Sequence, residues 1–293
     1  MTSPRLAIAT CADLPRLDRD GSLVLESLAR SGISAEPVIW DSPSARWASY
    51  DLVLVRSTWD YALRRDAFVR WAYSLPRVAN PAEVLRWNTD KRYLQALSAA
   101  GIPTVPTRFV GPDAPLELPG WAEFVVKPTV SAGSADTARW RRGDDDQAAL
   151  AHLAALRDAG RTAMLQPYLG AVVDAGESAL IYLGGVFSHS VRKGPILTAG
   201  TPPSSGAIGD HDEHEQITAR TATAAELAVA ERVLDAVPGG REQLVYARVD
   251  LIPDADGSPV LLELELTEPS LFLFTDPAAA DRLAAAVAGV LGG

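Results

Sequence analysis

The chain has 293 residues, of which 47% are apolar and 22% charged, an ordinary composition for a soluble globular protein of two or three lobes. The net charge of −10, without a visible basic stripe, argues against nucleic-acid binding. The sequence contains no apolar run long enough for a membrane span. The N-terminal segment lacks the pattern of a signal peptide, and a lone cysteine, Cys11, excludes a disulfide framework or a cysteine-based zinc cluster. We therefore expect a cytoplasmic protein.

The opening segment, residues 1–85, predicts a small parallel-sheet lobe. Strands are predicted at 5–10, 35–40 and 52–55, and helices at 21–31 and 64–75. A β-α-β-β-α order favours parallel strands. Ligands of such sheets gather at the carboxyl ends of the strands, where the stretches "TCADLP" and "RSTWDY" stand. We expect this lobe to bind the substrate.

The rest of the chain predicts two α+β lobes, at residues 86–165 and 166–293, so the fold class is α/β overall. Asn88 or Thr89 is expected to cap a helix that runs to about Ala100. Further helices are predicted at 144–159, 218–236 and 277–291, and a Gly/Pro/Ser-rich mobile loop at 194–215. Strands are predicted at 108–110, 124–128, 138–140 and 163–169, in a hairpin over 178–193 that turns at Gly184-Gly185, and at 243–253 and 259–266, joined by the turn "DADG".

Three carboxylates are predicted to converge near the end of the chain. Glu263 and Glu265 share one face of a strand because side chains alternate with period two. A hairpin through "DADG" brings Asp250 opposite them, and Arg248 faces the same way. Like charges so arranged repel unless a cation lies between them, and carboxylates together with substrate phosphates are typical magnesium ligands. The alternative is a hairpin with an acidic solvent face.

Lysine is rare in this chain, and two of its positions suit phosphate binding. Only Lys91, Lys127 and Lys193 are lysines among 27 basic residues. Either these positions need a compact ammonium, or the three lysines were retained on the surface by chance. Lys127 ends a strand just before the small-residue loop Ser131, Ala132, Gly133 and Ser134. Backbone N–H groups of such a loop can close over anionic oxygens. The loop follows neither the Walker nor the dinucleotide-binding pattern.

The ordered series "NTDK", "VVKPTVSAGS", "LQPYL", "GES", "ARVD" and "LLELE" resembles the ATP-grasp ligases, in particular the D-alanine–D-alanine ligase and glutathione synthetase-like branch. The resemblance implies an ATP molecule clamped between two α+β lobes behind an N-terminal substrate lobe. It assigns the ATP phosphates to Lys91, Lys127 and the loop Ser131–Ser134, adenine to Gln166, Pro167, Tyr168 and Leu169, ribose to Glu177, two magnesium ions to Asp250, Glu263 and Glu265, and the transferring phosphoryl group to Arg248.

Two residues depart from that family pattern. Many relatives carry Asn where this chain has Glu265, and Glu where it has Gln166. A third carboxylate still suits magnesium. Adenine is usually read by backbone groups, so we expect ATP to remain the nucleotide.

The stretches "IATCADLP" and "VRSTWDY" resemble, within the family, the O-ureido-serine cyclo-ligase of D-cycloserine biosynthesis and its relatives. A small amino-acid substrate is expected to meet Arg56, Ser57, Thr58, Trp59 and Asp60, with Arg56 on a carboxylate and Asp60 on an ammonium. The alternative is that Trp59 and Tyr61 are packing residues and Asp60 caps the following helix. Lys193 is expected to reach the γ-phosphate or the substrate.

The expected reaction is activation of a carboxylate by ATP and capture of the acyl phosphate by an amine-type nucleophile. Two alternatives remain open: an intermolecular dipeptide or amide ligase, and a nucleotide-binding protein without catalysis. Cys11 has no evident base partner that would make it a nucleophile, and His189 is expected to be structural. His211 and His214 have a spacing that resembles metal ligands, but a Gly/Pro-rich loop is a poor scaffold for a zinc site. The sequence leaves the substrate's chirality and the formation of a homodimer open.

Overall fold

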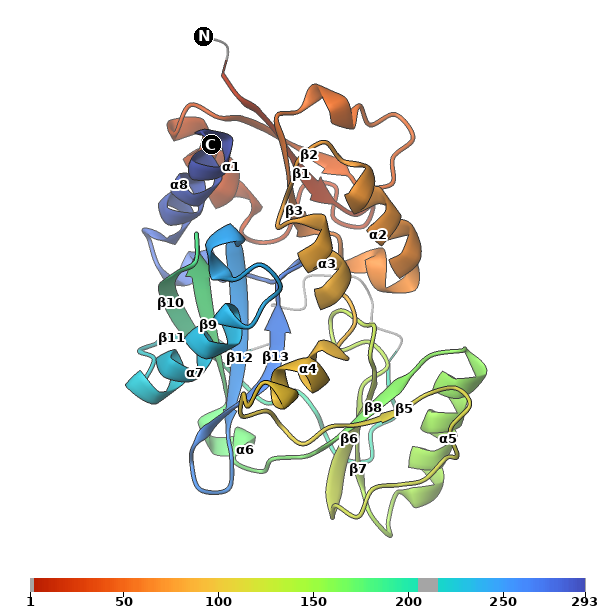
Figure 1. Ribbon diagram of the computed structural model, residues 1–293. Coiled ribbons are helices and arrows are strands. Elements are labelled where there is room, and N and C mark those ends of the chain that lie inside the picture. The colour runs from red at the N-terminus through yellow and green to blue at the C-terminus, as the bar shows by residue number, and fades with distance from the viewer. Residues whose placement is uncertain (1–2, 205–215, 293) are drawn as a thin grey trace.

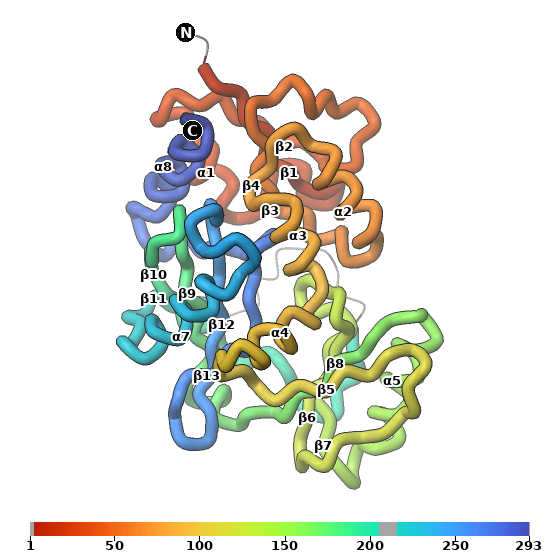
Figure 2. The backbone as a smooth tube through the Cα atoms, in the orientation of Figure 1, coloured from red at the N-terminus to blue at the C-terminus, as the bar shows by residue number. Residues whose placement is uncertain are grey.

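The computed structural model describes residues 3–204 and 216–292, which form three sheets with helices around them (Figure 1). The sheets draw their strands from residues 5–79, 108–167 and 177–265. The tube in Figure 2 shows the N-terminal sheet at one end of the molecule, the central sheet at the other and the C-terminal sheet beside both. The predicted α/β class, with one parallel sheet and two α+β parts, is confirmed. No helix within the described ranges is long and apolar enough to cross a bilayer.

The N-terminal sheet has the order β2-β1-β3-β4 and is parallel throughout. Its strands are β1 (Arg5–Thr10), β2 (Ser34–Ile39), β3 (Leu52–Ser57) and β4 (Val78–Ala79). All six residues of β3 are buried, as expected of a parallel strand covered on both faces. The flanking helices are α1 (Gly21–Arg30) and α2 (Arg65–Ser74), with the 3-10 turns η1 (Trp47–Ser49) and η2 (Trp59–Leu63) between them. The predicted parallel sheet is therefore present.

The central sheet is antiparallel, with the order β5-β8-β6-β7. Its strands are β5 (Arg108–Val110), β6 (Glu123–Pro128), β7 (Ala138–Arg141) and β8 (Ala163–Pro167), and the helix α5 (Asp146–Asp158) packs on it. Along β6, buried and half-buried residues alternate, so one face meets the core and the other faces the C-terminal part.

The C-terminal sheet, also antiparallel, has the order β11-β10-β9-β12-β13. Its strands are β9 (Glu177–Leu183), β10 (Val186–Lys193), β11 (Ile217–Arg220), β12 (Tyr246–Pro253) and β13 (Pro259–Glu265); the helices α6 (Val172–Ala175) and α7 (Ala224–Asp235) and the 3-10 turns η4 (Arg241–Gln243) and η5 (Leu273–Thr275) accompany them. Both predicted hairpins are present, and the first turns at Gly184-Gly185, whose φ angles are +60° and +75°.

The helix predicted from residue 218 was wrong at its start. Residues 217–220 pair with β10 as a strand, and α7 begins after Thr223. The Thr223 hydroxyl accepts from the Glu226 backbone N–H, and the Glu226 carboxylate accepts from the Thr223 N–H. This capping box has the sequence signature T-A-A-E, which fixes the helix start better than apolar periodicity does.

The helix predicted from Asn88 or Thr89 to Ala100 was wrong as well, because two helices occupy that region: α3 (Ala82–Asn88) and α4 (Tyr93–Ala99). The Lys91 backbone N–H donates to the Thr129 carbonyl at 2.8 Å, which draws the chain toward the central lobe and interrupts the helix. Asn88 caps neither helix; its amide donates to the Leu264 carbonyl at 2.8 Å and its side-chain oxygen accepts from the Leu266 N–H at 2.7 Å.

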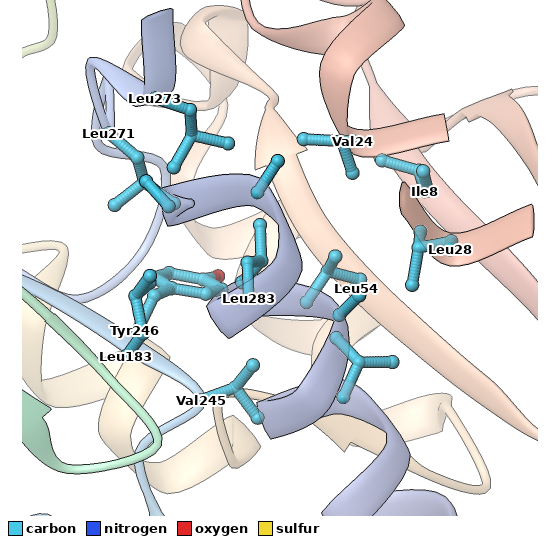
Figure 3. Packing of buried hydrophobic residues seen from close by; sticks show 14 of the residues in the cluster. Ile8, Val24, Leu28, Leu54, Leu183, Val245, Tyr246, Leu271, Leu273 and Leu283 are labelled. Atoms are coloured by element: carbon cyan, nitrogen blue, oxygen red, sulfur yellow. The ribbon is translucent and has the colours of Figure 1, made fainter. Parts of the chain in front are cut away.

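The last helix, α8 (Ala279–Gly292), packs against α1 of the N-terminal lobe and against the C-terminal sheet. Figure 3 shows Leu283 of this helix between Leu54 on one side and Tyr246 on the other. Leu54 and Leu283 are at most 1% exposed. The end of the chain thus joins the first and last lobes in one apolar core, which fixes how the N-terminal strand ends face the C-terminal hairpin.

Candidate active site

A cavity of about 360 Å³ lies where the three sheets meet. Every residue predicted to bind nucleotide, phosphate or metal lines it: Lys91, Lys127, Ser131, Ala132, Gly133, Ser134, Gln166, Pro167, Tyr168, Leu169, Glu177, Lys193, Arg248, Asp250, Glu263 and Glu265. These residues come from the central and C-terminal parts of the chain, and Trp59 and Tyr61 add the N-terminal part to the lining. The cavity therefore assembles the predicted constellation, and the roles of its members remain predictions.

The register of the β12–β13 hairpin places the acidic group. Arg248 stands opposite Glu265, and Asp250 opposite Glu263. Because these positions are two apart on each strand, their side chains share one face of the sheet. The structure places Asp250, Glu263 and Glu265 on a single surface, as expected.

Lys91 and Lys127 both contact Glu263. The Lys91 Nζ lies 3.2 Å from Glu263 Oε1, and the Lys127 Nζ lies 3.6 Å from Glu263 Oε2. Lys91 also donates to the carbonyl and the hydroxyl of Ser131, at 2.8 and 3.1 Å, so it ties β13 to the small-residue loop. In that loop Gly133 and Ser134 both have φ +55°, a left-handed turn that glycine adopts without strain.

Arg248 and Lys193 hold the other two carboxylates. Arg248 donates to Asp250 from Nε and Nη2, each at 2.9 Å, and also to Glu265. Lys193 donates to Asp250 at 3.2 Å and to Glu177 at 3.1 Å. Asp250, Glu263 and Glu265 therefore each have a cationic partner, which offsets the cost of removing a carboxylate from water.

The pKa values differ along this edge. Burial alone would raise the pKa of Glu263, but Lys91 and Lys127 outweigh it and lower the pKa to about 2. Burial likewise opposes ionisation of Asp250, whose pKa is nevertheless lowered by Arg248 and Lys193. Burial raises the pKa of Glu265 to about 7, because Arg248 does not offset the repulsion from Glu263 and Asp250. Burial also lowers the pKa of Lys127.

The chemistry of this donor set fits magnesium. Carboxylate oxygens are hard ligands, and Mg²⁺ at nucleotide sites usually takes one or two of them together with phosphate oxygens and water. Among the residues that the structure describes, no three acidic or histidine side chains converge closely enough to form a metal cage by themselves. Their oxygens are turned to Lys91, Lys193 and Arg248, so phosphates would have to complete the coordination.

The other end of the cavity suits a flat apolar ring. Val105, Val125, Val172, Ile252 and Leu262 line it beside the segment Gln166–Leu169. The buried amide of Gln166 donates to Thr107 Oγ1 at 3.0 Å. Its side chain is thus held by the protein, which leaves backbone groups of the segment to read a base.

Trp59 is the residue of the predicted substrate segment 56–60 that lines the cavity. Arg56 is 2% exposed and donates to the Pro269 carbonyl at 2.9 Å and to Asp18 at 3.3 Å. The Asp60 carboxylate accepts from Trp40 Nε1 at 2.7 Å and from Arg64. Ser57 and Thr58 are buried. The structure thus does not bring Arg56, Ser57, Thr58 and Asp60 to the cavity wall.

Sequence reasoning missed two ionisable residues of the cavity wall, Glu268 and Tyr61. Burial and the nearby Glu265 raise the pKa of Glu268 well above its usual range, and Tyr61 is hydrogen-bonded to it. Glu268 lies beyond the end of β13, so strand periodicity gives no signal for it. Its proximity to the "LLELE" segment was the one available hint.

Two of the remaining sequence candidates, Cys11 and His189, lie outside this cavity. Cys11 is buried, and burial raises the pKa of its thiol, which disfavours a nucleophile. The Nε2 of His189 lies 2.9 Å from the Leu271 carbonyl, a structural contact. His211, His214 and residues 205–215 of the predicted loop lie outside the described residues, whereas Pro195, Ile196 and Leu197 line the cavity.

Comparison with known proteins decides the family. A cycloserine biosynthesis protein, DcsG, of Streptomyces lavendulae is 37% identical over 97% of both chains. The chain belongs to the DcsG family. Its residues 6–81 match the model of the N-terminal domain of D-cycloserine synthetase DcsG. A crystal structure of that synthetase superposes with a TM-score of 0.88 at 35% identity, over 98% of this chain and 99% of the other.

More distant structures share the DcsG-family fold. An ATP-grasp RimK domain protein of Sphaerobacter thermophilus matches 97% of this chain and 100% of its own, with a TM-score of 0.67 and 21% identity. D-alanine–D-alanine ligase of Bacillus anthracis, complexed with ATP, matches 99% and 97%, with a TM-score of 0.65 and 13% identity. The predicted ATP-grasp fold is confirmed.

Proposed function

We propose that this protein cyclises O-ureido-serine: ATP phosphorylates the substrate carboxylate, and the oxygen-bound nitrogen of the same molecule displaces phosphate to close the ring. Hydrolysis of the carbamoyl group on that nitrogen then releases carbon dioxide and ammonia, and cycloserine, ADP and phosphate are the other products. The observation that carries the proposal is the joint presence of one cavity with the full phosphate and carboxylate set and a full-length similarity to a protein named for cycloserine biosynthesis.

The structural partition supports lobes at 1–85, 86–165 and 166–293, except that α3 and α4 pack on the C-terminal sheet and α8 on the first lobe.

The residues take roles according to their place in the cavity. Lys91, Lys127 and the loop Ser131–Ser134 bind the ATP phosphates, the segment Gln166–Leu169 binds adenine, and Glu177 binds ribose. Arg248 and Lys193 face the transferring phosphoryl group. Fixed cations around a buried phosphate stabilise charge that develops as the carboxylate attacks, and cost no reorganisation at that moment.

Asp250, Glu263 and Glu265 would hold two magnesium ions, which neutralise the charge of the β- and γ-phosphates when bound. The charge balance supports this role. Three carboxylates and Glu177 face four cationic side chains in the cavity, so an incoming triphosphate needs added positive charge. Chelation of magnesium should abolish ADP release, and titration of the metal should restore it.

The test is ADP release from ATP with one candidate substrate at a time, then with pairs. Release with O-ureido-serine alone, with cycloserine as the product by mass spectrometry, is the expected result. A requirement for two amino acids would instead identify an intermolecular dipeptide or amide ligase. Full physiological activity in a Glu263→Gln variant would indicate a nucleotide-binding protein without catalysis. Because the substrate is a small amino acid, its two enantiomers should be assayed separately.

A further inference from the structure

Five carboxylates line the cavity, and Glu268 differs from the other four. Glu177, Asp250, Glu263 and Glu265 each form an ion pair with a lysine or arginine. For Glu268, no ion pair is found across residues 3–204 and 216–292; its side chain is hydrogen-bonded to the neutral Tyr61 hydroxyl. Lys91, which is paired with Glu263, only partly offsets the causes that oppose ionisation of Glu268. A half-buried carboxylate without a cation of its own is costly, so Glu268 is suited to bind a cation from a ligand.

The backbone around Glu268 is held with unusual completeness. Four successive carbonyl oxygens each face a side chain: Trp59 Nε1 donates to Glu268 at 3.0 Å, Arg56 to Pro269 at 2.9 Å, Arg248 to Ser270 at 3.2 Å, and His189 Nε2 lies 2.9 Å from the Leu271 oxygen. These partners come from β3 and η2 of the first lobe and from β10 and β12 of the last. A functional carboxylate needs such rigid support to hold its position.

The surroundings of Glu268 suit a small organic cation. Trp59, Tyr61 and Phe272 line the cavity with it, and aromatic faces favour an ammonium. A phosphate is disfavoured there, because Glu265 and Glu263 already repel negative charge at this carboxyl. A bound ammonium would offset the two causes that oppose ionisation of Glu268, which are desolvation and repulsion from the neighbouring carboxylates.

We propose that Glu268 binds the α-ammonium group of the amino-acid substrate, with Trp59 and Tyr61 as positioning residues. This inference rests on the proposed function, since it assigns the substrate end of the same cavity. It moves the ammonium contact from Asp60, whose oxygens are taken by Trp40 and Arg64, to Glu268. The "RSTWDY" segment then contributes in two ways: Trp59 and Tyr61 line the cavity beside Glu268, and Arg56 and Trp59 hold the backbone of the loop that carries it.

The test compares binding of O-ureido-serine, as each enantiomer, with binding of 3-(ureidooxy)propanoate, which replaces the ammonium by hydrogen. Calorimetry in the presence of ADP and magnesium uses the wild type, Glu268→Gln and the control Glu242→Gln, which removes an exposed carboxylate on η4. We expect the wild type and the control to prefer one amino compound over the des-amino compound by at least about tenfold. Glu268→Gln should lose that preference while it keeps its ADP affinity.

Kinetics supply a second readout. A Tyr61→Phe variant should raise KM for the substrate several-fold and leave KM for ATP unchanged, whereas a purely structural role would change both or neither. Equal binding of amino and des-amino compounds by the wild type overturns the inference without any variant. The inference is also overturned if Glu268→Gln still prefers the amino compound as strongly as the wild type does. It is likewise overturned if this variant loses only affinity for magnesium. If the wild type prefers O-ureido-serine over the des-amino compound but releases no ADP with it, the proposed reaction is contradicted and the role of Glu268 is retained.

Discussion

The Nζ of Lys91 lies 3.2 Å from a carboxylate oxygen of Glu263 and 2.8 Å from the carbonyl of Ser131. One ammonium thereby joins the hairpin that would hold magnesium to the loop that would cover the phosphates. Lys91 lies between α3 and α4, at the point where the helix expected from the sequence is interrupted. That interruption places the lysine side chain in the cavity.

We predict that Lys91→Ala lowers kcat/KM for ATP by roughly 10²–10³, the usual cost of removing one preorganised charge at a reacting phosphate. Lys91→Arg should lose a similar factor, because a planar fork cannot occupy the place of a compact ammonium between Ser131 and Glu263. Steady-state kinetics check this. Arg142→Ala, which removes a cation on the exposed side of the central lobe, should stay within about twofold, as expected of a solvated surface charge; an active Lys91→Arg would refute the need for an ammonium.

The second prediction concerns acid stability. The pKa of Glu263 lies at about 2 in the folded protein and near 4.3 in an unfolded chain. A depressed carboxyl pKa stabilises the fold above the unfolded value, and that contribution disappears as pH falls from about 4.3 toward 2. Glu263→Gln should therefore be less stable than the wild type at pH 7, by on the order of 3 kcal/mol, and the difference should shrink toward pH 2. Urea unfolding across this range measures it; a difference independent of pH would contradict the ion-pair explanation.

The third prediction separates a structural Arg56 from a substrate-binding one. Its guanidinium is buried with Asp18 and the Pro269 carbonyl, so Arg56→Ala leaves a buried carboxylate unpaired. Unfolding should become easier by about 3–5 kcal/mol, as measured by urea titration. The exposed pair of Arg30 and Asp281 is the control, and Arg30→Ala should cost less than about 1 kcal/mol. Unchanged stability with a raised substrate KM would restore the binding role predicted from the sequence.

The fourth prediction addresses nucleotide choice. Gln166 donates its amide to Thr107 and is held away from a base-reading role. Gln166→Glu, which introduces the residue common in the family, should change KM for ATP by less than about threefold, since loss of one neutral hydrogen bond at a held side chain is modest. Parallel assays with ATP and GTP test the point, and a switch in preference would show that the side chain reads the base.

Local patterns in the sequence were sufficient for most of the elements. The parallel first lobe, both C-terminal hairpins and the terminal helix follow from apolar periodicity and turn residues, which act over a few positions. The errors at 88–100 and 218–223 have one cause. A backbone hydrogen bond from Lys91 to Thr129 and strand pairing of residues 217–220 with β10 are contacts between distant segments. Only the start of α7 was also marked locally, by its capping-box sequence.

The sequence by itself determined that Asp250, Glu263 and Glu265 converge on one surface, because their spacing on strands of known period fixes which side chains share a face. Only the tertiary structure decided the substrate end. Arg56 and Asp60 carry suitable charges, yet Asp18, Trp40 and Arg64 neutralise them within the first lobe. Glu268, unremarkable in the sequence, keeps an ionisable group without a cationic partner in the described cavity wall. The residue type sets the charge of a side chain, whereas the groups that the fold places beside it decide whether that charge can bind a ligand.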